Sequence, residues 1–174
     1  MLLVVQTLCF VALTVAAAVS DLRTRRIPNW LTVSGFVVAL LLAAVHGWPE
    51  LRSSLEGAGL AFGISIVLLA AGALGGGDAK LLTAIGAFMG PGRFFEALLI
   101  VGVVGGLLGI ANAVRQGVIV PVLLNSYNML KYGLTLGRRG YTRSLASPGA
   151  VAIPYGVPIA IGSLAWWFLG GVAR

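Results

Sequence analysis

The most unusual chemistry of this sequence lies in Gly75-Gly76-Gly77-Asp78-Ala79-Lys80, a short polar segment between two apolar runs. Acidic residues are scarce in the sequence, which holds 5 Asp and Glu among 174 residues, and only Asp21 and Asp78 are aspartates. A carboxylate at or near the depth of a lipid bilayer is costly, and such residues usually serve a function. We therefore expect the chain to fold so that these two carboxyl groups come together.

The composition is that of a membrane protein. The chain is 59% hydrophobic and 10% charged, with a mean hydropathy of +1.00, whereas soluble domains are about 45–50% apolar and about 25% charged. Apolar runs recur along the whole length, and several are long enough to cross a hydrocarbon core of about 30 Å. The sequence predicts an all-α polytopic membrane protein that forms one integral-membrane domain over residues 1–174.

The apolar runs predict about six transmembrane helices, joined by polar loops that include residues 21–29 and 46–56. The fourth run, Ala79 to Met89, is short even when it is counted from Asp78, so either the bilayer thins around it or Asp78 is recessed. Residues 117–137 have the pattern of an amphipathic helix at the membrane surface, with a seventh span as the alternative. The expected spans cover residues 2–19, 30–45, 57–74, 78–89, 94–114 and 150–172.

The distribution of basic residues predicts the topology. The net charge is +7, and the basic residues lie between the spans, which indicates topology and contact with anionic lipids rather than nucleic acid. Nine of the 12 Lys and Arg residues fall on the side that follows the first span. The positive-inside rule places that side, with Asp21 and Asp78, in the cytoplasm and both termini outside.

The first apolar run also allows a second interpretation. Small residues near its end, Ala16 to Ala18, would suit the cleavage site of a secretory signal peptide. Signal peptides begin with a basic region, however, and nothing before Asp21 is charged. We expect a retained span.

Two neighbouring carboxyls permit acid–base chemistry. Like charges a few ångströms apart do not both ionise readily, so the pair shares a proton. The ionised group then serves as a general base for water and the protonated one as a general acid to a peptide carbonyl, with neither role assigned to a particular residue. Gly75 and Gly77 would let an extended peptide approach closely, and Lys80 would either act on a carboxyl or, as we favour, reach the lipid headgroups.

Other interpretations use the same residues. Asp21 could pair with Arg23 or Arg25 at a helix end, and Asp78 could cap the fourth span. The protein could instead be a small transporter or channel subunit whose aspartates bind a cation or a proton, or a structural subunit without chemistry. Cys9 is the single cysteine, which permits no internal disulfide and no cysteine zinc site, and we expect no metal or cofactor.

The residues resemble those of the type IV prepilin peptidases, which are membrane aspartyl proteases of the GxGD class. The resemblance lies in three stretches: Gly75 to Leu81, Ser20 to Asn29 with its basic and Ile-Pro-Asn features, and Ile153 to Ala160. It implies that Asp21 and Asp78 form the catalytic pair and that Gly75 and Gly77 shape the loop. It also implies that the substrate is a prepilin or pilin-like helix, whose short leader is removed at the cytoplasmic membrane face.

One departure from the family pattern narrows the expectation. Longer family members carry an N-terminal region with a cysteine zinc motif and also methylate the new pilin terminus, whereas this sequence has only Cys9. The chain is similar to the short, peptidase-only branch, such as the enzymes that serve Flp/Tad pili. We expect peptidase activity without methyl transfer.

Overall fold

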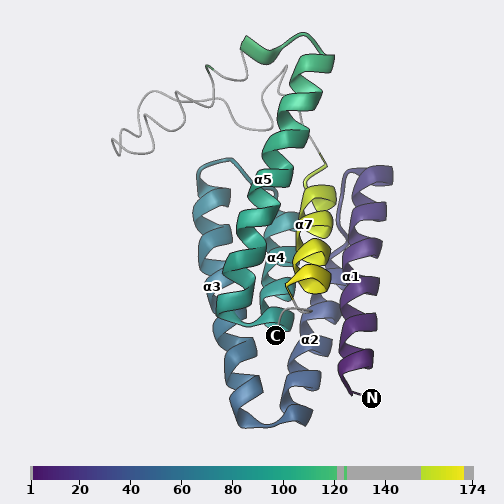
Figure 1. Ribbon diagram of the computed structural model, residues 1–174, viewed down its shortest axis with the longest axis vertical. Helices are drawn as coiled ribbons and strands as arrows, with labels where there is room; N and C mark the ends of the chain where they lie inside the picture. The colour runs from purple at the N-terminus through teal and green to yellow at the C-terminus, as the bar shows by residue number, and fades with distance from the viewer. Residues whose placement is uncertain (1, 121–123, 125–153, 171–174) are drawn as a thin grey trace.

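The computed structural model describes residues 2–120, 124 and 154–170, and within these residues it contains six helices and no strand. The helices pack side by side in a bundle, with α4 in its interior (Figure 1). Four of them, α1, α2, α3 and α5, are long and apolar enough to cross a membrane. The predicted all-α membrane fold is confirmed, and the expected number of about six helices agrees with it. The helices are α1 (Leu2–Thr24), α2 (Asn29–His46), α3 (Trp48–Ala70), α4 (Gly76–Met89), α5 (Pro91–Arg115) and α7 (Gly156–Leu169).

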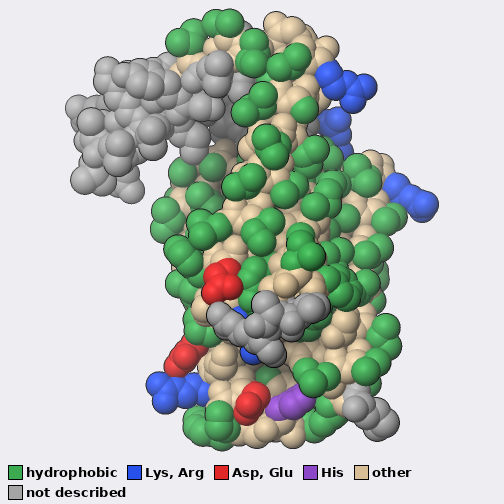
Figure 2. Space-filling model, in the orientation of Figure 1, with side chains coloured by type: hydrophobic (Ala, Val, Ile, Leu, Met, Phe, Trp, Pro, Cys, Tyr) green, Lys and Arg blue, Asp and Glu red, His purple; other side chains and the backbone are tan. Residues whose placement is uncertain are grey.

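The outer surface of the bundle is apolar. Hydrophobic side chains cover most of the face seen in Figure 2, and most of the charged side chains lie toward its two ends. Large hydrophobic residues such as Leu3, Val67 and Val103 are more than 60% exposed in the absence of lipid. This is the surface that a bilayer would cover.

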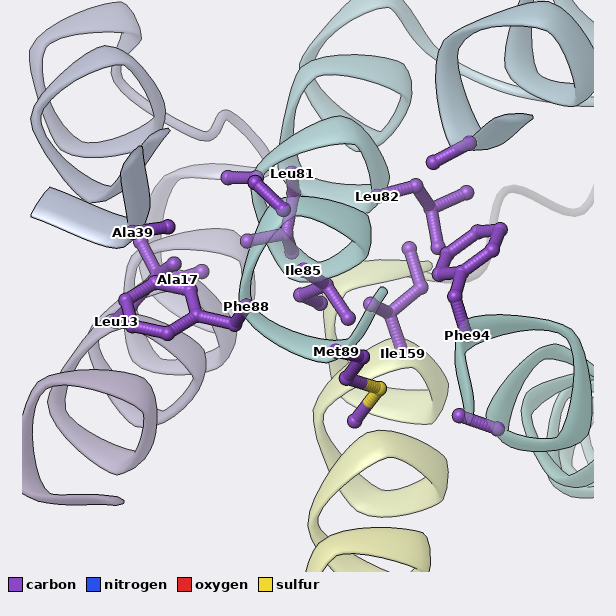
Figure 3. Packing of buried hydrophobic residues seen from close by; sticks show 14 of the residues in the cluster. Leu13, Ala17, Ala39, Leu81, Leu82, Ile85, Phe88, Met89, Phe94 and Ile159 are labelled. Atoms are coloured by element: carbon purple, nitrogen blue, oxygen red, sulfur yellow. The ribbon is translucent and has the colours of Figure 1, made fainter. Parts of the chain in front are cut away.

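The short helix α4 is the core of the bundle. Nine of its 14 residues are buried, and it contacts all five other described helices. Its side chains leave in several directions, Leu82 toward Phe94 of α5 and Ile85 toward Ile159 of α7 (Figure 3). A helix that is apolar all round is a buried helix. With 14 residues α4 is shorter than the long helices α1, α3 and α5 around it, in agreement with the short fourth run in the sequence.

Small residues bring α3 and α4 into backbone contact. A Cβ atom added at Gly86 would lie 2.5 Å from the carbonyl oxygen of Gly57 and 2.6 Å from Cβ of Ala61. On the same face the hydroxyl of Ser54 donates to the carbonyl oxygen of Ala87 over 2.6 Å. Close approach at small residues, with a side-chain hydrogen bond across the interface, is typical of helices that associate within membranes.

Helix α1 is part of the same core. The ring of Phe10 is fully buried, stacks on Trp167 with centroids 4.3 Å apart and meets Phe88 edge-on at 5.6 Å. Trp167 also donates to the hydroxyl of Thr7 over 3.3 Å. The first apolar run is thus packed against α4 and α7, as expected for a retained span.

The expected loop at residues 21–29 is shorter than predicted, because α1 continues through Thr24 and includes Asp21. The helix ends where Arg25 adopts a left-handed conformation, with φ of 51°. The hydroxyls of Ser20 and Thr24 donate to the carbonyl oxygen of Arg26 over 2.9 and 3.1 Å and fold the chain back. Polar residues at the end of an apolar helix can stay helical, so α1 continues beyond the end of the apolar run at residue 19.

The expected polar loop at residues 46–56 is wrong, since only Gly47 separates α2 from α3. Pro49 lies in the first turn of α3, where a missing N–H costs nothing. One turn further on, Arg52 and Glu56 form a salt bridge of 2.8 Å along the exposed helix surface. Both features suit a helix start, so this charged segment extends α3 instead of interrupting the chain.

Helix α3 also ends earlier than the expected residue 74. Gly72 has φ of 72°, its N–H bonds to the carbonyl oxygen of Leu69, and the N–H of Ala73 bonds to that of Leu68. This pair of bonds is a Schellman motif, which needs a residue that tolerates a left-handed conformation. The turn leads directly into Gly75 and Asp78.

At the C-terminal end, the described helix α7 begins at Gly156, directly after Pro154 and Tyr155. Pro158 falls in its first turn, where proline is compatible with a helix. The predicted amphipathic helix over residues 117–137 lies largely outside the described residues, as does the start of the span expected from residue 150.

Candidate active site

Asp21 lies near the C-terminal end of α1 and is 6% exposed. Its Oδ2 atom accepts a hydrogen bond of 2.7 Å from the backbone N–H of Gly156, the first residue of α7. A buried carboxylate requires such a donor, because an unpaired charge away from water is strongly unfavourable. No salt bridge joins Asp21 to Arg23 or Arg25 in the described part of the chain, so the arginine pairing considered from the sequence is not formed.

Asp78 is the third residue of α4, and the N-cap position before it is Gly75. The side chain of Asp78 folds back to accept a hydrogen bond from the backbone N–H of Gly75. This is the return half of a capping box, in which the acid of the first turn binds the N-cap amide. The possibility that Asp78 is itself the N-cap is therefore wrong, although it does contribute to capping α4.

Two contacts and one electrostatic interaction bring the two aspartate segments together. A Cβ atom at Gly77 would lie 3.3 Å from Cβ of Ile27, in the link that follows α1. The Nζ atom of Lys80 donates to Oδ1 of Asn29, at the start of α2, over 2.8 Å. The charge of Asp21 also acts electrostatically on Asp78. The two aspartates thus occupy the same end of the bundle, with one at the C-terminal end of α1 and the other at the N-terminal end of α4.

Each carboxyl is held by a backbone N–H from the first turn of a helix. Asp78 is bound by the N-cap of its own helix, whereas Asp21 is bound by the first residue of α7. The N-terminus of a helix carries free N–H groups and a partial positive charge, which favour a carboxylate there. Carboxyl groups placed in this way at one end of a bundle could pass a proton to and from a reacting group.

The structure gives the candidate substrate-binding residues definite neighbours. A Cβ atom at Gly75 would lie 2.8 Å from Oδ2 of Asp78, so the absence of a side chain there leaves room for the catalytic candidate itself. Gly77 leaves room for Ile27, as described above. Gly76 has nothing within 4 Å of its Cβ position, and Lys80 is exposed. Within the described ranges, no three His, Cys, Asp or Glu side chains gather in one place.

Gly156 was not anticipated as a site residue from the sequence. It lies 135 positions after Asp21, and no local pattern connects the two. The run from Ile153 to Ala160 is one of the three stretches that carry the family resemblance, but nothing in it specified which residue would meet an aspartate.

A family model described as the type IV leader peptidase family matches residues 8–110 of this chain. The matched region includes both aspartates and helices α2 to α4 in full, and it stops before α7. No curated protein and no solved structure matches the chain.

Proposed function

Because the chain belongs to the type IV leader peptidase family and is a membrane peptidase, we propose that it is an aspartic endopeptidase that uses Asp21 and Asp78 to activate water. Its substrates would be prepilins of the Flp-like class, whose N-terminal leader it removes. The observation that carries the proposal is that the sequence's two aspartates, 57 positions apart in the chain, lie at one end of the bundle and interact electrostatically.

The proposed reaction needs one proton shared by two carboxyls. The ionised carboxylate takes a proton from water while the oxygen attacks the scissile carbonyl, and the protonated carboxyl donates its proton to the carbonyl oxygen. The tetrahedral intermediate then collapses as the C–N bond breaks. The leaving amine takes a proton from the protonated carboxyl, and a hydroxyl of the intermediate gives a proton to the other carboxylate, so the pair again holds one proton. Because two interacting carboxyls titrate as a unit, the proposal leaves open which of the two starts as the base.

The proposed site faces the cytoplasm of the bacterial inner membrane. Support comes from the excess of basic residues on the side of the chain that follows α1, which marks the cytoplasmic side of a membrane protein. Both aspartates fall on that side, and both termini would then lie outside. A prepilin offers its leader on the cytoplasmic side and its apolar helix to the membrane, so a cleavage site between them would lie at the level of this end of the bundle.

The decisive experiment is cleavage of a prepilin from the same genome, chosen for a basic leader and a glycine before its apolar helix. The wild type, Asp21→Asn and Asp78→Asn would be compared at matched amounts in the membrane. Glu50→Gln is the matched control, because Glu50 is an exposed carboxylate in the first turn of α3, at the opposite end of the bundle.

We expect the wild type and Glu50→Gln to shorten the prepilin and both aspartate variants to leave it intact. Cleavage at the normal rate by either aspartate variant would contradict the two-carboxyl mechanism. Measurements of cation or proton flux in reconstituted vesicles would then be the next step, because they test the alternative use of a carboxylate pair in a membrane.

A further inference from the structure

Gly156 has a special place among the backbone groups of α7. As the first residue of the helix it carries an N–H that no carbonyl of the same helix can accept. That N–H donates to Oδ2 of Asp21, and both residues are buried. A hydrogen bond from a backbone amide to a carboxylate is roughly twice as strong as one between neutral groups. The bond therefore ties the orientation of the Asp21 carboxyl to the position of α7.

The absence of a side chain at residue 156 is also required by this geometry. A Cβ atom there would lie 2.9 Å from both Cβ and Oδ2 of Asp21 and 3.2 Å from Cγ. Relief is difficult, because Cβ of Asp21 is fixed by the backbone of α1. Any other residue at position 156 would push the carboxyl away or displace the start of α7.

The remainder of α7 is held firmly enough to make that N–H a fixed point. A Cβ atom at Gly162 would lie 2.7 Å from the backbone nitrogen of Val101, so α5 and α7 touch through their backbones. Further along, Nε1 of Trp166 donates to Oε2 of Glu96 over 2.9 Å. Contacts with α5 and α1 thus hold α7 in place, which fixes the position of the Gly156 N–H that binds Asp21.

We propose that Gly156 is a positioning residue of the peptidase, which orients Asp21 through its backbone N–H and through the space left by its missing side chain. This inference rests on the proposed function, since it concerns the alignment of a residue assigned there to the reaction. It adds α7, which lies outside the region that the family model matches, to the set of helices that build the site.

The first test compares Gly156→Ala with Gly162→Ala in the same helix. Both variants place a methyl group against a close neighbour, but only residue 156 touches Asp21. For Gly156→Ala we expect kcat for prepilin cleavage to fall by about 10- to 100-fold with KM within about twofold, since small misplacements of a reacting group cost rate more than binding. For Gly162→Ala, which disturbs the contact of α7 with α5 but does not touch Asp21, we expect a lower thermal midpoint in detergent and, at the same folded fraction, a smaller loss of kcat than for Gly156→Ala.

The second test needs no substitution at residue 156. Hydrogen exchange of the first turn of α7 would be measured in the wild type, Asp21→Ala and Asp78→Ala. Loss of the acceptor in Asp21→Ala should speed exchange of the Gly156 amide by about tenfold or more, as the strength of a hydrogen bond to a charged group implies. Asp78→Ala should leave the exchange rate of this amide unchanged, because its partner is Gly75.

The outcomes separate this inference from the proposed function. Full cleavage by Asp21→Asn would overturn both. If Asp21→Asn is inactive, the positioning role alone fails when Gly156→Ala keeps its kcat, or when Gly162→Ala loses as much kcat at the same folded fraction. An exchange rate at Gly156 that does not respond to Asp21→Ala also overturns it, whether or not Gly156→Ala folds.

Discussion

The Nζ atom of Lys80 donates to Oδ1 of Asn29 over 2.8 Å, so the helix that carries Asp78 is joined by a side chain to the first residue of α2. This bond spans the same two segments that Gly77 and Ile27 bring into contact. Unlike the contacts of Asp21, it lies on the exposed surface. This exposed position indicates that the Lys80–Asn29 hydrogen bond connects the two segments and that Lys80 takes no part in the reaction.

Removal of the Lys80 ammonium should therefore have a small effect. For Lys80→Met we expect a cleavage rate within about threefold of the wild type and a change in unfolding free energy within about 0.5 kcal/mol, because exposed polar pairs contribute little. Asn29→Ala, which removes the acceptor and keeps the charge, should behave alike in the same assays. A loss of cleavage comparable to that of Asp78→Asn would instead place Lys80 in the reaction.

The contact between α3 and α4 makes a sharper prediction about stability. A Cβ atom at Gly57 would meet the carbonyl oxygen of Gly86 and lie 2.6 Å from Cα of Gly90, neither of which can move without shifting a backbone. We expect Gly57→Ala to lower the unfolding free energy by about 1–3 kcal/mol, as overpacking of a core does. The measurement is denaturant or detergent titration followed by helix content.

Two glycines of the same helix provide the controls for that experiment. Gly59 and Gly63 have nothing within 4 Å of their Cβ positions. Gly59→Ala and Gly63→Ala should be neutral or should stabilise the protein by up to about 1 kcal/mol, because alanine favours a helix more than glycine does. Equal destabilisation by all three changes would mean that the loss does not come from the backbone contact at Gly57, since helix propensity alone would favour alanine at each position.

A third prediction concerns two buried serines on α3. The hydroxyl of Ser54 donates to the carbonyl oxygen of Ala87 over 2.6 Å, whereas the equally buried hydroxyl of Ser65 has no hydrogen-bond partner among the described residues. Ser54→Ala should cost about 0.5–1.5 kcal/mol of unfolding free energy, the net value of a hydrogen bond between helices. Ser65→Ala removes an unsatisfied group of nearly the same size and should leave stability unchanged or raise it. A larger loss of unfolding free energy for Ser65→Ala than for Ser54→Ala in the same titration would contradict these hydrogen-bond assignments.

The sequence predicted the helices well where apolarity and helix extent coincide. Helices α2 and α5 lie within a few residues of the expected spans, because each is bounded by a proline and by polar residues. The prediction failed at the end of α1 and the start of α3. Hydropathy reports which residues suit lipid, but a helix continues for as long as its backbone bonds and caps allow. Asp21 was therefore expected in a loop and is found in a helix.

The site was only partly predictable for a related reason. The rarity of aspartate singled out Asp21 and Asp78, and the alternation of spans predicted that both lie on one side of the membrane. Of the two backbone N–H groups that bind the carboxyls, only one could be predicted from the sequence. Gly75 precedes Asp78 by three residues, which is the spacing of a capping box. The N–H of Gly156 comes from a distant helix. Because every residue except proline has a backbone N–H, the residue type does not show that this one binds Asp21.

The enclosure of α4 has a consequence for how the protein responds to its membrane. Bilayers differ in thickness, and helices that face lipid adapt to a mismatch by tilting or by distorting the lipid around them. Helix α4 contacts every other described helix and most of its side chains are buried. It therefore has little contact with lipid and little need to adapt to the bilayer thickness. Changes in lipid thickness should then act first on the outer helices and reach Asp78 only through them.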